Sequence, residues 1–324
     1  MASVPSFTLN NGRRIPSVGL GCWMGSFGDN EEVYEMCKKA ISVGYRHFDT
    51  AAGYGNEKQV GRAIRDSGVP RSEFYVVTKL PNSHHHLVKE AFDQSLKDLD
   101  CEYIDLYLMH WPQALLRGEP FWSHNALQPN DHPTFVDCWK DMEKLLETDK
   151  VKSLGVSNFS IKNLGILLPH CTVVPTVNQI ECHPCLPEHE LKAYCDTQKI
   201  LLTAWSPLGK PGNGQEISLL TDLVVRGIAD KHGADVSQVL LSWGVQRQTI
   251  VIPKTVNEVR MKINISLINL DNKDIETLDQ LHKQPGMHRA LSDVHMPNGK
   301  VFGWTYEQLG WNMTTGGIVV SPSD

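Results

Sequence analysis

Short apolar runs alternate with longer amphipathic stretches along this chain from about residue 18 onward. Several runs, such as Phe74-Tyr75-Val76-Val77-Thr78, are apolar nearly throughout, which is typical of parallel strands buried on both faces. The stretches between them place apolar residues three and four positions apart, as over 88–99, and this spacing predicts helices with one buried side. Eight runs have the strand character: 18–22, 45–49, 74–80, 103–110, 151–157, 173–180, 200–206 and 249–254.

Repeated strand–helix units predict a parallel sheet, and eight of them in 324 residues fit an α/β fold of the closed (β/α)8 TIM-barrel type. We expect a β-hairpin over residues 6–17, because Asn10-Asn11-Gly12-Arg13 contains the Asn-Gly pair favoured in tight hairpin turns. The barrel would then occupy residues 18–283 and an extended C-terminal tail residues 284–324, so that 1–324 form a single domain.

The main alternative is a doubly wound dinucleotide-binding fold, for which the best evidence is Gly19-Leu20-Gly21-Cys22-Trp23-Met24-Gly25. This glycine spacing is one residue longer than the usual fingerprint, and Trp23 and Met24 are bulky where a phosphate would approach. Helical patterning resumes only near Asn30. We therefore interpret the run as unrelated to coenzyme binding.

Composition and charge narrow the classes of function. The content of 41% hydrophobic and 21% charged residues is ordinary for a globular protein, and the net charge of -6 argues against broad binding to nucleic acid or anionic membrane. No apolar run approaches the roughly 18–20 residues needed to cross a bilayer, and the first residues lack the basic start of a signal peptide. Eight scattered cysteines fit reduced thiols. We expect a cytoplasmic protein, a monomer or weak homodimer.

Two short motifs are possible metal sites, and we expect neither to bind a metal. Cys182-His183-Pro184-Cys185 has the spacing of half a zinc site, but no second pair completes it. His84-His85-His86 has no acidic neighbour, and adjacent histidines in a loop rarely all face one ion. We interpret the histidines as a solvated loop.

The strongest chemical signal is the set of residues at the ends of consecutive strands. The second run ends in Asp49, with Tyr54 in the turn beyond it; Lys79 ends the third run and His110 the fourth. In a barrel, strand ends meet at one rim, where active sites lie. Each residue alone has an ordinary explanation as a turn, capping or ion-pair residue. Together they predict a phenol beside an ammonium that a carboxylate holds in place.

That grouping suits proton donation to a carbonyl oxygen. A neighbouring ammonium favours the ionised phenol, so we expect Lys79 to make Tyr54 a stronger acid.

Later strand ends carry groups suited to a nucleotide. Ser157, Asn158 and Gln179 could bind a carboxamide, and Trp205 offers a flat face for stacking. Each of the three polar residues is also ordinary for capping a loop. Another group, at the eighth strand end, could bind a phosphate locally: Lys254, Thr255 and Arg260.

With these residues in order, the chain strongly resembles the aldo-keto reductase family over about residues 7–283. The matching blocks are Gly44-Tyr45-Arg46-His47-Phe48-Asp49-Thr50-Ala51, Tyr54-Gly55-Asn56-Glu57, Thr78-Lys79, Met109-His110-Trp111, Gly155-Val156-Ser157-Asn158-Phe159, Asn178-Gln179-Ile180-Glu181, His183-Pro184, Ser206-Pro207-Leu208-Gly209 and Ile252-Pro253-Lys254.

The resemblance implies reduction of aldehydes or ketones by NADPH, with Tyr54 as proton donor, Asp49 and Lys79 tuning it, and His110 orienting the substrate. It further implies a coenzyme loop over 206–215 and a 2'-phosphate site that favours NADPH over NADH. The implied coenzyme contacts are Ser157, Asn158, Gln179, Trp205, Ser206, Leu208, Lys254, Thr255, Arg260 and Asn264. This chain has Trp205 where the family more often has Tyr, and Ile263 where it often has Glu.

The substrate pocket is less defined by the sequence. The resemblance implies that Trp23, Trp111 and Trp122 wall it. The tail carries further aromatic residues, most of which we expect to pack the tail onto the barrel: Phe302, Trp304, Tyr306 and Trp311. Sugar aldehydes, uronates and aromatic aldehydes all stay open as substrates. A coenzyme-binding barrel that acts as a regulatory or structural subunit is the alternative function.

Overall fold

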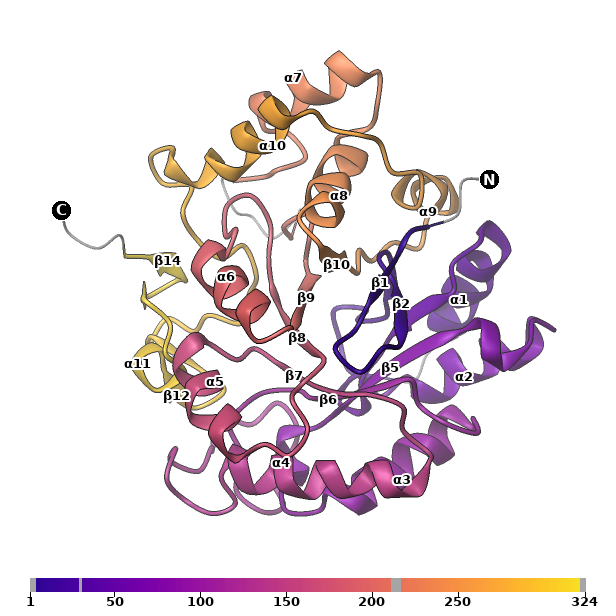
Figure 1. The fold of residues 1–324 in the computed structure, drawn as a ribbon, viewed down its shortest axis with the longest axis vertical. Coiled ribbons are helices and arrows are strands. Elements are labelled where there is room, and N and C mark those ends of the chain that lie inside the picture. The colour runs from indigo at the N-terminus through magenta and orange to yellow at the C-terminus, as the bar shows by residue number, and fades with distance from the viewer. Residues whose placement is uncertain (1–3, 29–30, 211–216, 321–324) are drawn as a thin grey trace.

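The computed structural model describes residues 4–28, 31–210 and 217–320. Its centre is a sheet of eight parallel strands in sequence order (Figure 1). The strands are β3 (Leu20–Gly21), β4 (His47–Asp49), β5 (Tyr75–Leu80), β6 (Leu106–Met109), β7 (Leu154–Ser157), β8 (Val177–Glu181), β9 (Leu201–Trp205) and β10 (Thr249–Val251).

The first and last of these strands meet, so the sheet closes on itself. Val18 forms a parallel bridge with Val251. The backbone N–H of Gly19 donates to the Val251 carbonyl at 2.9 Å, and that of Gly21 donates to the Pro253 carbonyl at 3.1 Å. The predicted (β/α)8 barrel is therefore confirmed, with each strand lying inside or overlapping its predicted run.

Helices surround the strands (Figure 1). They are α1 (Glu31–Val43), α2 (Glu57–Asp66), α3 (Val88–Leu99), α4 (Phe135–Lys144), α5 (Ile161–Leu167), α6 (His189–Thr197), α7 (Leu223–His232), α8 (Val236–Gln246), α9 (Glu258–Asn264) and α10 (Asn272–Asp279). In α1 the buried positions are the apolar ones spaced three and four apart, as a helix packed by one face requires. None of the helices in the described ranges is long and apolar enough to span a membrane.

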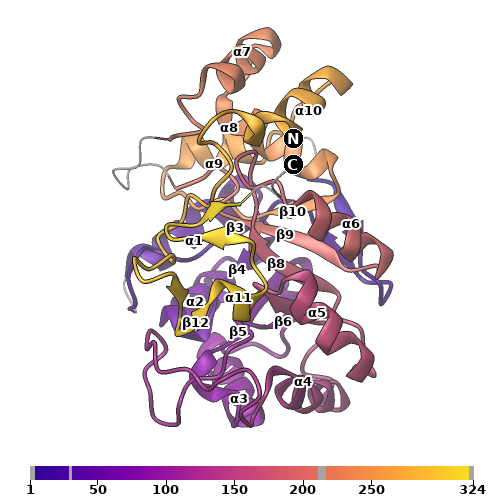
Figure 2. The same ribbon diagram turned by 90° about the vertical axis from the view of Figure 1, so that its left-hand side faces the viewer.

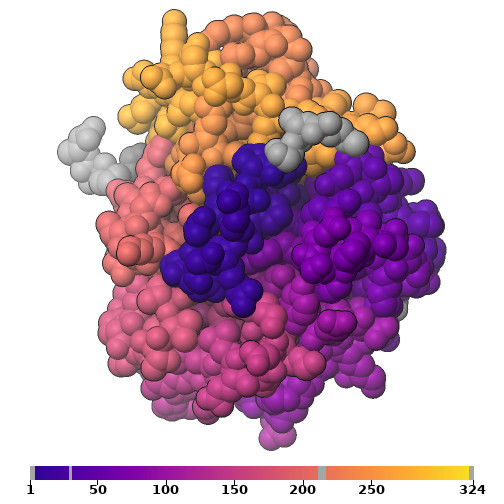
Figure 3. Space-filling model, turned by 45° about the vertical axis from the view of Figure 1, so that its right-hand side comes forward, coloured from indigo at the N-terminus to yellow at the C-terminus, as the bar shows by residue number. Residues whose placement is uncertain are grey.

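The two chain ends cover opposite ends of the barrel. The predicted hairpin forms from β1 (Ser6–Thr8) and β2 (Arg14–Pro16) and lies on the surface of the molecule (Figure 3). Asn11 Nδ2 donates to Ser153 Oγ, just before β7, at 2.9 Å, so the hairpin covers the end where the strands begin. The tail lies at the end where strands finish (Figure 2). It contains β11 (Lys300–Val301), β12 (Trp304–Thr305), α11 (Tyr306–Leu309), β13 (Met313–Thr314) and β14 (Ile318–Val319). It remains a prediction that the hairpin, the barrel and the tail form a single domain.

The glycine run at β3 serves packing inside the barrel. A β-carbon on Gly19 would lie 2.7 Å from the His47 ring, and one on Gly21 would lie 2.8 Å from the Ile252 carbonyl oxygen. Only glycine lets the neighbouring strands approach this closely. The resemblance of this run to a dinucleotide fingerprint therefore has a structural cause.

The histidine motif departs from the sequence-based expectation. His85 is buried, and its ring nitrogens have no hydrogen-bond partner among the described residues. Burial lowers its pKa to about 3, so the ring is neutral. The expectation of a solvated loop was wrong for this residue, because the segment around it is packed against the protein, with Asn82 and Ser83 buried as well.

Candidate active site

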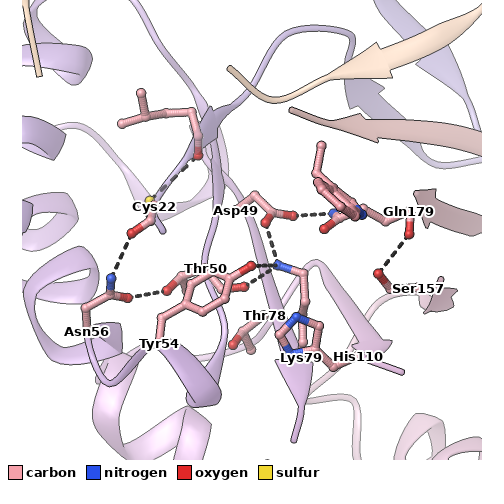
Figure 4. A network of polar contacts seen from close by, with 12 residues as sticks. Cys22, Asp49, Thr50, Tyr54, Asn56, Thr78, Lys79, His110, Ser157 and Gln179 are labelled. Atoms are coloured by element: carbon pink, nitrogen blue, oxygen red, sulfur yellow. Dashed lines mark hydrogen bonds and ion pairs between the residues drawn. The ribbon is translucent and has the colours of Figure 1, made fainter. Parts of the chain in front are cut away.

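The four predicted catalytic residues meet at the rim where the strands end (Figure 4). Asp49 ends β4, Lys79 lies near the end of β5, His110 follows β6, and Tyr54 ends a 3-10 turn over Ala52–Tyr54. The Lys79 ammonium donates to Asp49 Oδ1 at 2.5 Å, to the Thr50 carbonyl at 2.8 Å and to Tyr54 Oη at 3.4 Å. Lys79 and Asp49 are both buried, so this ion pair is shielded from solvent.

The turn that carries Tyr54 is held by two residues that the sequence reasoning did not select. Thr50 Oγ1 donates to Asn56 Oδ1 at 2.6 Å, and Asn56 Nδ2 donates to the Cys22 carbonyl at 2.8 Å. Between them Gly55 takes the left-handed conformation, with φ of 70°, which favours glycine. These contacts fix the phenol above Lys79.

The electrostatics correct one expectation. Burial raises the pKa of Tyr54 above its ordinary value and outweighs the lowering by the Lys79 ammonium. The Lys79 ammonium thus acts on the pKa of Tyr54 in the predicted direction, but burial, which the sequence did not reveal, sets the net direction. Burial alone would lower the pKa of Lys79, but Asp49 and Tyr54 raise it overall. Both residues hold their protons at neutral pH.

His110 completes the group as a neutral ring. Its centroid lies 5.7 Å from that of Tyr54. Burial, assisted by the Lys79 charge, lowers its pKa well below the ordinary value. A neutral imidazole donates one hydrogen bond and carries no charge. The rim can thus present two neutral donors, a phenol and an imidazole, to one oxygen atom.

Aromatic rings pack around Tyr54 and onward to the tail. Trp23 lies 5.0 Å from Tyr54 between ring centroids, and Trp111 lies 5.0 Å from Phe302 and 6.1 Å from Trp311 of the tail. Two tail aromatics, Trp304 and Tyr306, are instead buried as packing residues.

The sequence reasoning missed Phe121, whose ring stacks on His110 at 5.5 Å and 21°. Phe121 fits there because Gly53 has no side chain; a β-carbon would lie 2.5 Å from the ring. Trp122, the predicted wall residue beside it, is 55% exposed and packs on Phe27 at 5.4 Å.

Four of the predicted coenzyme residues form one network with Asp49. Gln179 Nε2 donates to Asp49 Oδ2 at 2.6 Å, and Ser157 Oγ donates to the Gln179 carbonyl at 2.8 Å (Figure 4). Asn158 Nδ2 donates to the His110 carbonyl at 3.0 Å, and Trp205 Nε1 donates to Asn158 Oδ1 at 3.1 Å. The groups predicted to hold a nicotinamide therefore connect directly to the proton-donating group.

After β9 the chain turns sharply at Ser206, where φ is 49°, and the Gly209 N–H donates to the Ser206 carbonyl at 2.8 Å. Leu208 is partly buried beside this turn. The rest of the predicted coenzyme loop, from 211 onward to 215, lies outside the described residues.

The predicted phosphate residues lie around the start of α9. Thr255 Oγ1 accepts from the Asn257 N–H at 3.2 Å, and Asn257 Oδ1 accepts from the Arg260 N–H at 3.0 Å. Lys254 and Arg260 are exposed, and neither forms an ion pair with a described residue, whereas Asn264 is buried at the other end of the helix. Two exposed cations are thus available to an anion.

The cysteines and histidines do not gather into a metal site. The eight cysteines are free thiols. Over residues 4–28, 31–210 and 217–320, no three His, Cys, Asp or Glu side chains are placed to hold a metal ion.

Comparison with known proteins gives consistent matches over most of the chain. The Aldo/keto reductase family model matches residues 17–283. Glycerol 2-dehydrogenase (NADP(+)) of Saccharomyces cerevisiae is 40% identical over 301 residues, covering 89% of this chain and 94% of that protein. D-galacturonate reductase of Hypocrea jecorina is 39% identical over 312 residues, covering 92% and 97%. A crystal structure of an aldo-keto reductase complexed with NADPH superposes with a TM-score of 0.78 at 32% identity, covering 87% of this chain and 88% of that one.

Proposed function

Because the chain belongs to the aldo/keto reductase family, we propose that it reduces aldehydes or ketones to alcohols with NADPH, with Tyr54 as the proton donor. The observation that carries this proposal is the position of the Lys79 ammonium, 2.5 Å from Asp49 Oδ1 and 3.4 Å from Tyr54 Oη, with Lys79 and Asp49 both buried. An ammonium there stabilises negative charge that develops on the phenol as its proton leaves.

The residues of the site fit the coenzyme. Ser157 and Gln179 supply polar groups beside Asp49, Trp205 supplies a flat surface, and the exposed cations Lys254 and Arg260 can bind a phosphate. Bound NADPH supplies the hydride that the carbonyl carbon accepts. The two cations support a preference for NADPH, whose 2'-phosphate NADH lacks.

The protein groups then act on the carbonyl oxygen. Tyr54, which keeps its proton at neutral pH, donates that proton to the oxygen as negative charge develops there. His110, neutral for the same reason of burial, donates a hydrogen bond that orients the carbonyl. Asp49 keeps the Lys79 ammonium in place, so the phenolate left behind is stabilised at once.

The aromatic walls indicate how the substrate is bound. Trp23 packs on Tyr54, Phe121 stacks on His110, and Phe302 contacts both Phe121 and Trp111. Such walls exclude water from the reacting oxygen and suit a small carbonyl compound with an apolar face, which includes the face of a sugar aldehyde. Trp122 stays a proposed wall residue at the outer edge.

The test is NADPH oxidation, followed by the loss of its near-ultraviolet absorbance, with a panel of sugar, uronate and aromatic aldehydes. Turnover of at least one class, measured as kcat/KM, is expected. Binding of NADPH with no turnover of any aldehyde or ketone would favour a regulatory or structural subunit instead. Tyr54→Phe is the control, because it should bind NADPH and lose reduction.

A further inference from the structure

Trp205 does more in this structure than present a flat ring. It ends β9, and its indole N–H donates to Asn158 Oδ1 at 3.1 Å across the rim of the barrel. A phenylalanine or tyrosine ring has no N–H at this point. The contact therefore depends on the indole itself, and stacking on a nicotinamide would not require it.

Both the backbone and the side chain of Asn158 are fixed by hydrogen bonds. Its backbone takes a left-handed conformation with φ of 65°, and its N–H donates to the Gln179 carbonyl at 2.8 Å. Its Nδ2 donates to the His110 carbonyl and to Ser157 Oγ, both at 3.0 Å. Since Oδ1 only accepts and Nδ2 only donates, the bond from Trp205 determines which way the amide faces. With the amide reversed, the contact with His110 would be lost.

We propose that Trp205 is a positioning residue whose indole N–H, through the Asn158 amide, fixes the backbone of His110 relative to the surface on which the nicotinamide stacks. This inference rests on the proposed function. Two hydrogen bonds in series join the coenzyme surface to the residue that orients the carbonyl. Small displacements of such a residue lower the rate of reaction, because the reacting atoms must be held in a narrow geometry.

The kinetic test compares Trp205→Phe, Asn158→Asp and the double variant that combines them. Trp205→Phe keeps a flat ring and removes the N–H. Asn158→Asp keeps the acceptor for Trp205 and removes the donor to His110. We expect Trp205→Phe to lower kcat about five- to tenfold at saturating NADPH, the effect of one net hydrogen bond, while the NADPH dissociation constant, measured by calorimetry, changes less than about threefold.

Asn158→Asp should also lower kcat. The double variant should lose no more than the worse single variant, because both changes interrupt the same chain of contacts.

Trp243→Phe is the matched control. It removes an indole N–H that donates to Asp279 Oδ1 at 2.9 Å from α8, on the outside of the barrel. It should lower thermal stability and leave kcat unchanged. If Trp205→Phe keeps the parental kcat, or if the losses in the double variant multiply, the positioning role is refuted.

A second measurement does not depend on turnover. In nitrogen–proton NMR spectra the Trp205 indole N–H, identified by its absence in Trp205→Phe, should exchange slowly with solvent. It should exchange rapidly in Asn158→Gly, which removes the acceptor and tolerates the positive φ. Rapid exchange in the parent protein overturns the positioning role even if the enzyme is active. Slow exchange in a protein without reductase activity would confirm the hydrogen bond between Trp205 and Asn158 and would refute only the proposed function.

Discussion

Replacing Lys79 by methionine keeps a long side chain at a fully buried position and removes its charge. The Asp49 carboxylate then stays buried and, among the described residues, keeps Gln179 Nε2, at 2.6 Å, as its side-chain partner. The substitution also removes the hydrogen bonds from the ammonium to the Thr50 carbonyl and to Tyr54 Oη. We therefore expect Lys79→Met to lower both stability and activity.

The magnitude follows from the burial of the pair. Removing one partner of a buried ion pair costs about 3–5 kcal/mol, because the other charge is left uncompensated. The Gln179 bond compensates part of this, which favours the lower end, about 3 kcal/mol. Each kcal/mol shifts the midpoint of a large domain by about 2–4 °C, so thermal unfolding followed by circular dichroism should occur about 6–12 °C lower.

The double variant Asp49→Asn/Lys79→Met distinguishes the effect of a buried unpaired charge on stability from the effect of Lys79 on catalysis. It leaves no uncompensated charge, and replacing a whole buried pair is often neutral for stability. Its unfolding midpoint should recover most of the loss seen in Lys79→Met, while NADPH-dependent reduction stays absent. A single variant that unfolds at the parental temperature, or a double variant less stable than the single, would refute this account of the pair.

Three further predictions follow from the same contacts. Because the pKa of Tyr54 is raised, the kcat/KM of reduction should stay level through neutral pH and fall only as alkaline pH removes the phenol proton. A fall in kcat/KM that begins near neutral pH would contradict this assignment. Tyr54→Phe should lower the rate of reduction about a hundred- to ten-thousandfold. Glu181→Ala removes the acceptor of the Leu291 and Ser292 N–H groups and of Ser292 Oγ, so it should destabilise the fold by about 2–3 kcal/mol in thermal unfolding. Burial alone would raise the pKa of Glu181, but hydrogen bonds from His183, Ser292 and Leu291 lower it overall. The difference in stability between parent and variant should therefore be complete above about pH 4.5 and shrink as the pH falls through the lowered pKa. A difference in stability that does not change with pH would contradict this account. Lys254→Ala and Arg260→Ala should raise the KM for NADPH far more than that for NADH, and equal increases would show that neither binds the 2'-phosphate.

The barrel could be predicted from the sequence because its causes are local. Strand and helix periods are read within single segments, as in Tyr75–Leu80 and Glu31–Val43, and eight such units have few ways to bury their apolar faces. Parallel strands also bring their ends to one rim. The meeting of Asp49, Lys79 and His110 therefore followed from their spacing by one strand–helix unit each.

The tertiary structure alone decided what happens between those residues. The net direction of the Tyr54 pKa depends on how far burial outweighs the Lys79 ammonium, and the burial of His85 depends on how its segment packs in the folded chain. The stacking of Phe121 on His110 depends on a loop that occupies the space left by Gly53. The bonds from Gln179 to Asp49 and from Trp205 to Asn158 join segments 130 and 47 residues apart. A sequence shows which groups each strand end carries, but hydrogen bonds and desolvation depend on distances of a few tenths of an ångström, which only the packed barrel sets.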